Sequence, residues 1–312
     1  MNENEFTDWL LHASTPSIPY QTMLDLLGFP ADEPRVVQAH QAIMSTGAVP
    51  AMLSRQSENG QWRGERSYYT PKYISSHWSM LLLTEYCADG SDLRFQQGAR
   101  HMLDTTMAEL NQRLPVNELG WSCFWGNLLR YSLQSGMLHD ACVQNVIRYT
   151  SLDLQAGPCC CTHNASQPCA WGVVRTLWGL AAIPKTQRTP ATNEAIARGV
   201  EFLLDSFRLV EANYPTKDGQ DANPLWFKLN FPLFYQVDIL FSLRVLDELE
   251  LLDHPASRAA LDWLEQLRGR NGRWPGTSPY RQRTWRELGD WEETDRWVSL
   301  QAARVLRHAG RL

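Results

Sequence analysis

Residues 71–86 read PKYISSHWSMLLLTEY, and this stretch decides the fold class. Its apolar residues surround nearly the whole circumference of a helix, so the helix that it predicts is buried on most sides. The next segment, from Asp92 to about Met107, carries its apolar residues on one side and is expected to cover the first helix. The two segments together predict an inner helix backed by an amphipathic outer helix.

This alternation recurs along the chain, at the spacing of a repeat that has two helices per unit. Near-apolar helices are predicted from around Trp121, Cys169, Pro232 and Trp297, and amphipathic helices around 139–153, 190–209 and 255–268. No strand candidate of useful length competes, so the predicted class is all-α. A linear solenoid and a closed ring both satisfy the repeat. Inner helices that are apolar on most faces favour the ring, because an open solenoid would leave one side of them in water.

The chain is predicted to form one body, since no Gly/Ser/Pro-rich linker divides it. Short helices and a helix from Pro34 form a helical N-terminal extension over residues 1–46, which we expect to pack on the ring. Gly47 and Pro50 interrupt the helical pattern there. Residues 47–312 are predicted to form the α/α toroid domain, a closed ring of inner and outer helix pairs.

Composition narrows the class of protein. Apolar residues make up 44% of the chain and the formal net charge is −5, which fits a soluble globular protein with a large core. No basic run is present, so neither nucleic acid nor an anionic membrane surface is an expected partner. The acidic N-terminus lacks the features of a signal peptide, and no transmembrane segment is predicted. The seven cysteines are therefore expected in the reduced cytoplasm, as free or metal-bound thiols.

Two segments share a Gln, Gly and Trp pattern that follows an apolar helix end. They are Gln56-x3-Gly60-x-Trp62 and Gln266-x5-Gly272-x-Trp274. Both resemble the QW motifs of squalene-hopene cyclases, in which Gln ties a helix terminus to the next turn, Gly permits the bend and Trp stacks on the helix. We therefore expect an architectural role for both segments.

The alternating helices of residues 47–310 also resemble the α/α toroid shared by those cyclases and by protein prenyltransferase β subunits. The chain looks most like the small, single-toroid bacterial proteins of this kind. The resemblance implies a barrel of helix pairs around a central pocket. Two departures matter: the Asp-x-Asp-Asp motif of the cyclases is missing, and Asp238 is followed by Leu240 where the prenyltransferases have a zinc-binding Cys. Neither catalytic set therefore transfers to this chain.

Residues 157–172, GPCCCTHNASQPCAWG, concentrate four cysteines and one histidine. Zinc favours four thiolate or imidazole ligands, or three ligands and a water. We predict a zinc site formed by Cys161, His163 and Cys169, with Cys123 or Cys159 as the fourth ligand. Two alternatives stay open: small buried residues that only pack, and a redox or nucleophilic thiol, for which Cys169 at a helix N-terminus is placed.

Three residues are candidates for catalysis. Asp238 lies on an apolar inner helix, where desolvation raises the pKa of a carboxyl group and suits it to donate a proton. The alternative is a structural aspartate that caps the helix or pairs with Arg244 or Arg296. His77 starts an inner helix and is predicted to face the pocket, or else to be a hydrogen-bonded core residue. Tyr235 is predicted to stabilise a carbocation through its ring.

A central aromatic pocket is predicted to hold the substrate. Its expected lining is Tyr73, Trp78, Trp121, Trp125, Asn127, Trp171, Phe234 and Trp297. The leading hypothesis is an enzyme of the terpenoid cyclase/prenyltransferase-like class that acts on a hydrophobic, isoprenoid-like substrate, with or without zinc. The alternative is a non-enzymatic protein that binds a lipid-like ligand or serves as a scaffold, with a structural metal. The sequence leaves the oligomeric state open.

Overall fold

The computed structural model describes residues 3–116, 120–214, 216–219 and 221–312. Over these ranges the regular structure consists of helices, and the β pairing is limited to isolated bridges. The prediction of an all-α chain is confirmed. The helices of the described ranges include none with both the length and the apolar character to cross a membrane.

The N-terminal part lies against the C-terminal helix. It comprises α1 (Glu3–Leu11), α2 (Ser17–Gln21), a π-helical turn (Thr22–Leu26), α3 (Pro34–Ser45) and α4 (Ala48–Leu53). Elements α1, α2 and the π-helical turn contact α13 (Trp291–His308). Trp9 Nε1 donates to Glu292 Oε1 (2.8 Å), and Ser17 Oγ donates to the carbonyl of Tyr86 (2.6 Å). The N-terminal helices are therefore joined both to α13 and to the end of α5.

The inner helices are α5 (Ser76–Glu85), α7 (Ser122–Gln134), α9 (Ala170–Ala181), α11 (Ile239–Glu248) and α13. Each contacts the next in this order. Tyr86, directly after α5, packs edge-on against Trp297 of α13 with 5.3 Å between ring centroids. All ten residues of α5 are buried, as their apolar pattern predicts.

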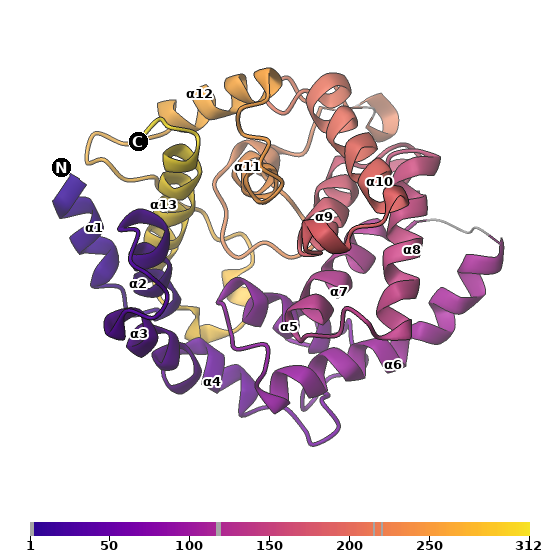
Figure 1. Ribbon diagram of the computed structural model, residues 1–312, viewed down its shortest axis with the longest axis horizontal. Coiled ribbons are helices and arrows are strands. Elements are labelled where there is room, and N and C mark those ends of the chain that lie inside the picture. The colour runs from indigo at the N-terminus through magenta and orange to yellow at the C-terminus, as the bar shows by residue number, and fades with distance from the viewer. Residues whose placement is uncertain (1–2, 117–119, 215, 220) are drawn as a thin grey trace.

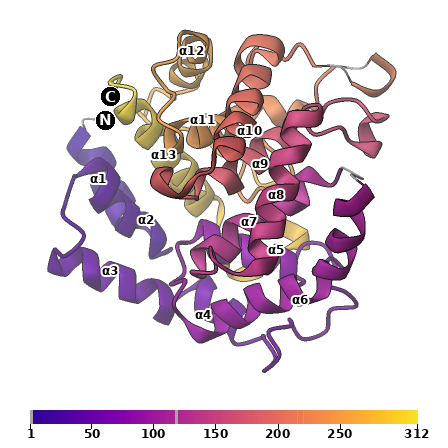
Figure 2. The same ribbon diagram turned by 45° about the vertical axis from the view of Figure 1, so that its right-hand side comes forward.

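The outer helices are α6 (Leu93–Val116), α8 (Ala141–Ala156), α10 (Pro190–Glu201) and α12 (Arg258–Gln266). Figure 1 shows these four helices on the outside of the molecule and α5, α7, α9 and α11 inside them. Turning the view, as in Figure 2, shows α8 in front of α7 and α9. Outer helices bury one side only: in α12 the buried residues are Ala260, Leu261 and Leu264.

The two QW-like segments share one contact. Trp62 Nε1 donates to the carbonyl of Met52 (3.1 Å), and Trp274 Nε1 donates to that of Leu264 (2.8 Å), so each indole holds the end of the helix before it. Gln56 Nε2 donates to the carbonyls of Gly60 (3.1 Å) and Arg94 (2.9 Å), as predicted. Gln266 is instead exposed at the end of α12, so the second segment keeps the tryptophan contact without a buried glutamine.

Helices α7 and α9 approach each other backbone to backbone. A Cβ atom on Gly126 would lie 2.4 Å from the carbonyl oxygen of Arg175, and one on Gly179 would lie 2.5 Å from that of Gly126. Neither neighbour is a side chain that can rotate away. Glycine at these two positions therefore sets the distance between the helices.

Replacing Gly126 by alanine is expected to lower the free energy of unfolding by about 2 kcal/mol, since overpacking costs about 1–3 kcal/mol and the better helix propensity of alanine offsets part of it. Urea unfolding measures the change. Gly199→Ala in α10 is the matched control, because the nearest atoms to a Cβ there belong to the side chains of Leu177 and Leu154, which can move, and not to the backbone. Equal losses for the two variants would contradict the backbone contact.

Candidate functional site

A cavity of about 660 Å³ lies at the N-terminal ends of α7 and α9. Its walls come from the starts of α7 and α9, from the cysteine-rich loop, from Tyr69 and Lys72, and from residues between Phe207 and Trp226 together with Tyr235. Most of the large side chains that line it are aromatic: Tyr69, Trp121, Trp171, Phe207, Tyr214, Trp226 and Tyr235. Pockets of this volume and character commonly bind small molecules.

This cavity differs from the predicted central pocket. Among the predicted lining residues, Trp121 and Trp171 line it, and so does the catalytic candidate Tyr235. The other six predicted residues lie in the buried core and do not line it: Tyr73, Trp78, Trp125, Asn127, Phe234 and Trp297. They pack on other core groups; the ring of Tyr73, for example, stacks on that of Phe234 with 4.3 Å between centroids.

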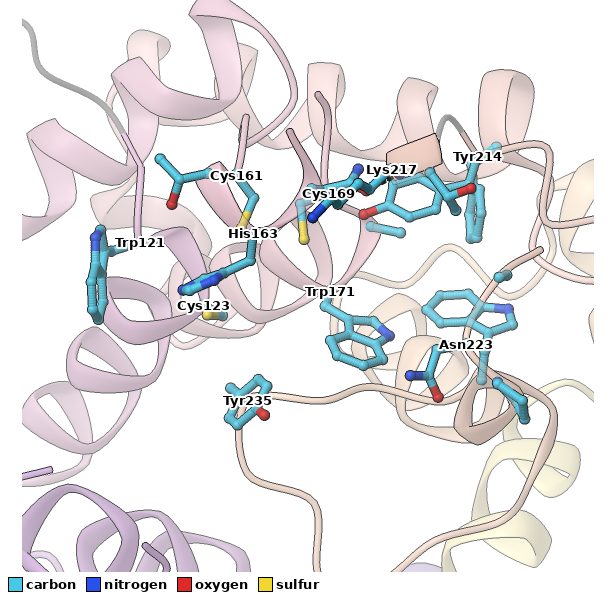
Figure 3. A pocket seen from close by; sticks show the side chains of 18 of the residues that line it. Trp121, Cys123, Cys161, His163, Cys169, Trp171, Tyr214, Lys217, Asn223 and Tyr235 are labelled. Atoms are coloured by element: carbon cyan, nitrogen blue, oxygen red, sulfur yellow. Dashed lines mark hydrogen bonds between the residues drawn. The ribbon is translucent and has the colours of Figure 1, made fainter. Parts of the chain in front are cut away.

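All four predicted zinc ligands, Cys123, Cys161, His163 and Cys169, line the cavity. Figure 3 shows them together on one side, with Asn223 across the cavity. Within the described ranges, however, no three His, Cys, Asp or Glu side chains are gathered closely enough to hold a metal ion. The alternative fourth ligand Cys159 is buried, with its sulfur 3.7 Å from Thr176 Oγ1. Zinc at this loop therefore stays a prediction.

Hydrogen bonds fold the loop back on itself and place Cys161 beside Cys169. The backbone N–H of Cys161 donates to the carbonyl of Gln167 (3.0 Å), and the Cys161 carbonyl accepts from the N–H groups of Asn164 and Ser166 (2.9 Å each). Cys169 is the N-cap of α9, and its sulfur accepts from the N–H of Gly172 (3.4 Å). The two thiols are hydrogen-bonded to each other.

The thiols of this pair have opposite acidities. The hydrogen bond from Cys169 lowers the pKa of Cys161 to about 6, and the backbone N–H groups of His163 and Asn164 add to this effect against the opposing effect of burial. The hydrogen bond to Cys161, together with burial, raises the pKa of Cys169 well above its ordinary value. Cys161 is therefore the more acidic thiol of the pair and the one that ionises first, while Cys169 keeps its proton. Burial raises the pKa of Cys123 to about 12, so this neighbour stays protonated.

Asp238 lies outside the cavity and is the N-cap of α11. Its Oδ1 accepts from the N–H of Phe241 (2.7 Å), and its Oδ2 accepts from both the N–H and the Nδ2 of Asn230 (2.9 and 3.0 Å). Burial raises its pKa to about 6, as the apolar surroundings predict. This geometry matches the capping alternative, whereas Arg244 pairs with Glu85 (2.8 Å). The proton-donor role of Asp238 stays a prediction.

His77 is fully buried and does not line the cavity. Its Nδ1 lies 3.2 Å from the hydroxyl of Tyr131, and its ring stacks on that of Tyr69, which does line the cavity, with 6.0 Å between centroids. Burial, with the nearby charge of Arg175, lowers the pKa of His77 to about 3. The geometry is that of the hydrogen-bonded core histidine, and an acid–base role for His77 stays a prediction.

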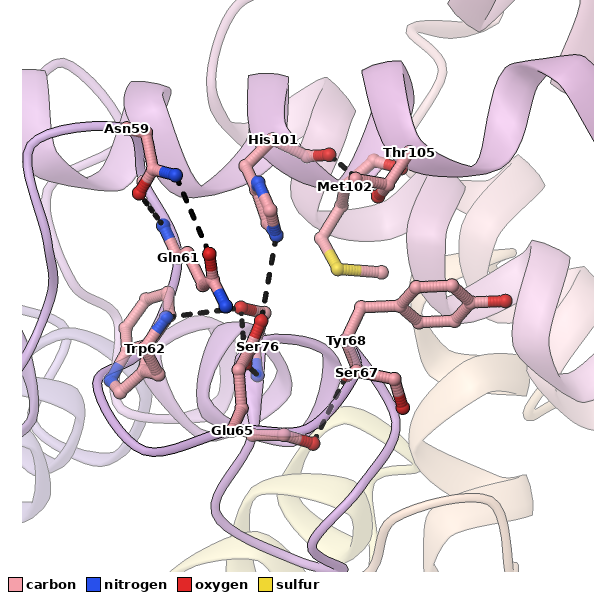
Figure 4. Close-up of polar contacts among 12 residues, drawn as sticks. Asn59, Gln61, Trp62, Glu65, Ser67, Tyr68, Ser76, His101, Met102 and Thr105 are labelled. Carbon is pink, nitrogen blue, oxygen red and sulfur yellow. Dashed lines mark hydrogen bonds and ion pairs between the residues drawn. The ribbon is translucent and has the colours of Figure 1, made fainter.

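A second polar cluster contains Ser76, Glu65 and His101, the residue types of a nucleophilic triad (Figure 4). Glu65 Oε2 accepts from both the N–H and the Oγ of Ser76 (2.7 Å each), and Glu65 Oε1 lies 3.6 Å from His101 Nε2. In a catalytic triad the histidine lies between the nucleophile and the acid. Here the carboxylate lies between them, so the cluster fixes the start of α5.

Sequence reasoning missed several polar residues of the cavity, among them Lys72, Tyr214 and Lys217. The backbone N–H of Lys217 donates to Asn164 Oδ1 (2.8 Å), which joins the far wall of the cavity to the cysteine-rich loop. Tyr214 is hydrogen-bonded to Cys169. Lys72 had one signal in the sequence: it is the only charged residue of the stretch 71–86 apart from Glu85.

Comparisons with known proteins add nothing to this geometry. No family model, no curated protein and no solved structure matches the chain. The functional assignment therefore depends on the cavity and its residues.

Proposed function

We propose that the protein is an enzyme of the terpenoid cyclase/prenyltransferase-like class, built as an α/α toroid, that binds a hydrophobic, isoprenoid-like substrate in the cavity at the ends of α7 and α9. The order of contacts along the inner helices supports the toroid. The aromatic walls support an apolar substrate, because such rings bury large apolar areas and interact with cations through their faces.

The reacting group of this proposal is the Cys161 thiolate. A thiolate, and not a thiol, is the nucleophile in cysteine chemistry, and the pKa of about 6 makes Cys161 mostly ionised at pH 7. The Cys169 thiol holds this thiolate in place by a hydrogen bond. The thiolate attacks an electrophilic carbon of a substrate bound against Trp121 and Trp171. As the S–C bond forms, the bond from that carbon to an anionic leaving group breaks, and the group departs with the electron pair. This thiol–thiolate pair in an aromatic cavity is the observation that carries the proposal.

Zinc is a secondary part of the proposal. Cys123, Cys161, His163 and Cys169 supply the donor types that zinc prefers, but the loop would have to draw them closer before they could surround one ion. The thiolate chemistry proposed here does not depend on a metal. We further propose a cytoplasmic location, because the seven cysteines are free and a reducing compartment keeps thiols in that state.

One observation favours the non-enzymatic alternative. The acid–base candidates Asp238 and His77 lie outside the cavity, so its walls would suit a protein that only binds a lipid-like ligand. The two functions differ in what Cys161→Ser does. Loss of substrate conversion with ligand binding kept indicates an enzyme, whereas unchanged behaviour in every assay indicates a binding protein.

Alkylation tests the proposed site. Iodoacetamide is expected to react with Cys161 first, with a rate that rises with pH through a midpoint near 6. At pH 6 about half of a thiol with this pKa is ionised, whereas roughly one part in a thousand of a thiol with a pKa of 9 is ionised. A thiolate from a more acidic thiol is a weaker nucleophile, so the expected ratio of the two alkylation rates is roughly twentyfold. Mass spectrometry of peptides gives the rate at each cysteine.

Geranyl bromide, an isoprenoid electrophile, is expected to alkylate Cys161 with a rate that saturates as its concentration rises, since it binds in the cavity before sulfur displaces bromide. Cys161→Ser removes the fast reaction with both reagents. Cys160→Ser is the matched control, because Cys160 is the exposed neighbour and does not line the cavity. A midpoint near 9 at Cys161, or a geranyl bromide rate that does not saturate, would refute the proposed site.

A further inference from the structure

Lys72 is a cation at the aromatic wall of the cavity. Its Nζ lies 4.9 Å from the ring centroid of Tyr69 and 5.0 Å from that of Tyr235. Both rings line the same cavity as Lys72 itself. Contacts of this length place the ammonium group over the negative faces of the two rings, which fixes its position beside the cavity.

Arg283 is a second cation beside Lys72. Its guanidinium lies 5.2 Å from the ring centroid of Tyr73, the residue after Lys72, and the N–H of Tyr73 donates to the carbonyl of Arg283 (3.0 Å). Burial and, next, the positive charge of Arg283 lower the pKa of Lys72. The two side chains are therefore close enough to repel each other.

In the parts of the chain that the structure describes, neither cation pairs with a carboxylate. Two other arginines, in contrast, have hydrogen-bond or ion-pair partners. Arg55 pairs with Glu287 (2.7 Å), and Arg281 donates to the carbonyls of Gly289 and Asp290 (2.6 and 2.7 Å). Lys72 is partly buried and Arg283 is exposed beside it, so a bound anion would offset both the repulsion between the two cations and the desolvation of Lys72. Their position next to an apolar cavity indicates which kind of anion.

We propose that Lys72, which lines the cavity, and Arg283, which is exposed beside it and outside the cavity lining, form a subsite for the anionic group, a carboxylate, phosphate or sulfonate, of an amphipathic substrate whose apolar part lies against Trp121 and Trp171. This inference rests on the proposed function, since it uses the same cavity and adds the charge of the substrate. An anion held at Lys72 orients the molecule, because one end is fixed by charge and the other must occupy the apolar space. Cys161 lines that same space.

Two fluorescent probes with the same aromatic skeleton test the subsite. 1-Anilinonaphthalene-8-sulfonate carries an anion and N-phenyl-1-naphthylamine does not. We expect both probes to bind the wild-type protein, and we expect added salt to weaken the binding of the sulfonate only. The double variant Lys72→Met/Arg283→Met is expected to bind the sulfonate at least tenfold more weakly and the neutral probe within twofold of wild type, because a hydrogen bond to a charged group is lost.

Matched variants make each outcome decisive. Arg66→Met removes an exposed arginine of the same segment that does not line the cavity and is expected to leave both affinities unchanged. Lys72→Arg, in the presence of Arg283, is expected to keep sulfonate binding. If the double variant binds the sulfonate as tightly as the wild type does, the subsite is refuted but the cavity as a binding site is not. The same holds if the double variant has the melting temperature of the wild type and loses affinity for both probes equally. Binding of neither probe to the wild type would overturn the proposed function itself.

Discussion

Replacing Asp238 by alanine is expected to lower the free energy of unfolding by on the order of 3 kcal/mol. The carboxylate caps α11 through the N–H of Phe241, and loss of an N-cap costs about 1–2 kcal/mol. It also accepts from the buried N–H of Asn230, and leaving such a donor unsatisfied costs a further 1–3 kcal/mol or so. Relief of the desolvation that raises its pKa offsets part of the loss. Urea unfolding at pH 7 measures the difference.

The control for this prediction is Asp253→Ala, at an exposed turn after α11, which is expected to unfold like the wild type. The same experiment separates the two roles of Asp238. If the alanine variant were as stable as the wild type but inactive in a substrate assay, the cap would be of minor importance and Asp238 would be the proton donor that the sequence suggested.

Acid is expected to destabilise the wild-type protein more than the His77→Phe variant. The pKa of His77 is about 3 in the folded protein, whereas an unfolded histidine has a pKa of 6.5. Between these values the unfolded chain binds a proton at His77 and the folded chain does not, so stability that is present above pH 6.5 is lost as the pH falls towards 3. The loss is about 1.4 kcal/mol per pH unit, or about 3 kcal/mol by pH 4.5.

The measured quantity is the difference between wild type and His77→Phe in the change of unfolding free energy from pH 7 to pH 4.5. Asp153 and Asp238, whose pKa values burial raises to about 6, bind protons in the folded state over part of this range and act in the opposite direction. They are present in both proteins, so their contribution cancels. His139→Phe, at an exposed histidine, is expected to keep the wild-type pH dependence. Parallel pH curves for wild type and His77→Phe would contradict a buried neutral histidine.

The sequence predicted the helices whose burial pattern is local. Predicted starts at Trp121 and Cys169 fall one residue before α7 and α9, because a near-apolar run is recognisable without knowledge of its neighbours. The start predicted at Pro232 was wrong: α11 begins at Ile239, since Asp238 caps it. The preceding residues are held elsewhere, with the N–H of Phe231 donating to the carbonyl of Thr277 (2.8 Å). That pairing joins distant segments, and no local pattern reveals it.

For the site, the sequence located the cysteine-rich loop but not the position of the cavity. Cys161, His163 and Cys169 are close in the chain, so a short loop keeps them together. Whether an aromatic ring lines a cavity or is buried in the core depends on its contacts with residues that are distant in the sequence. The ring of Tyr73, for example, stacks on that of Phe234. The proximity of Lys72 to Arg283 is equally non-local, since more than two hundred residues of sequence separate them.

The glycine contact between α7 and α9 has a consequence for the shape of the cavity. A junction made of main-chain atoms has no rotamers to exchange, so the spacing of these two helices cannot adapt to the size of a guest molecule. Trp121 and Cys169 each lie one residue before one of these helices, so the distance between them is fixed by the helix contact. Any adjustment to a bulkier bound molecule then has to come from the opposite wall, where Asn223 lies at the start of the short 3-10 helix Pro224–Phe227.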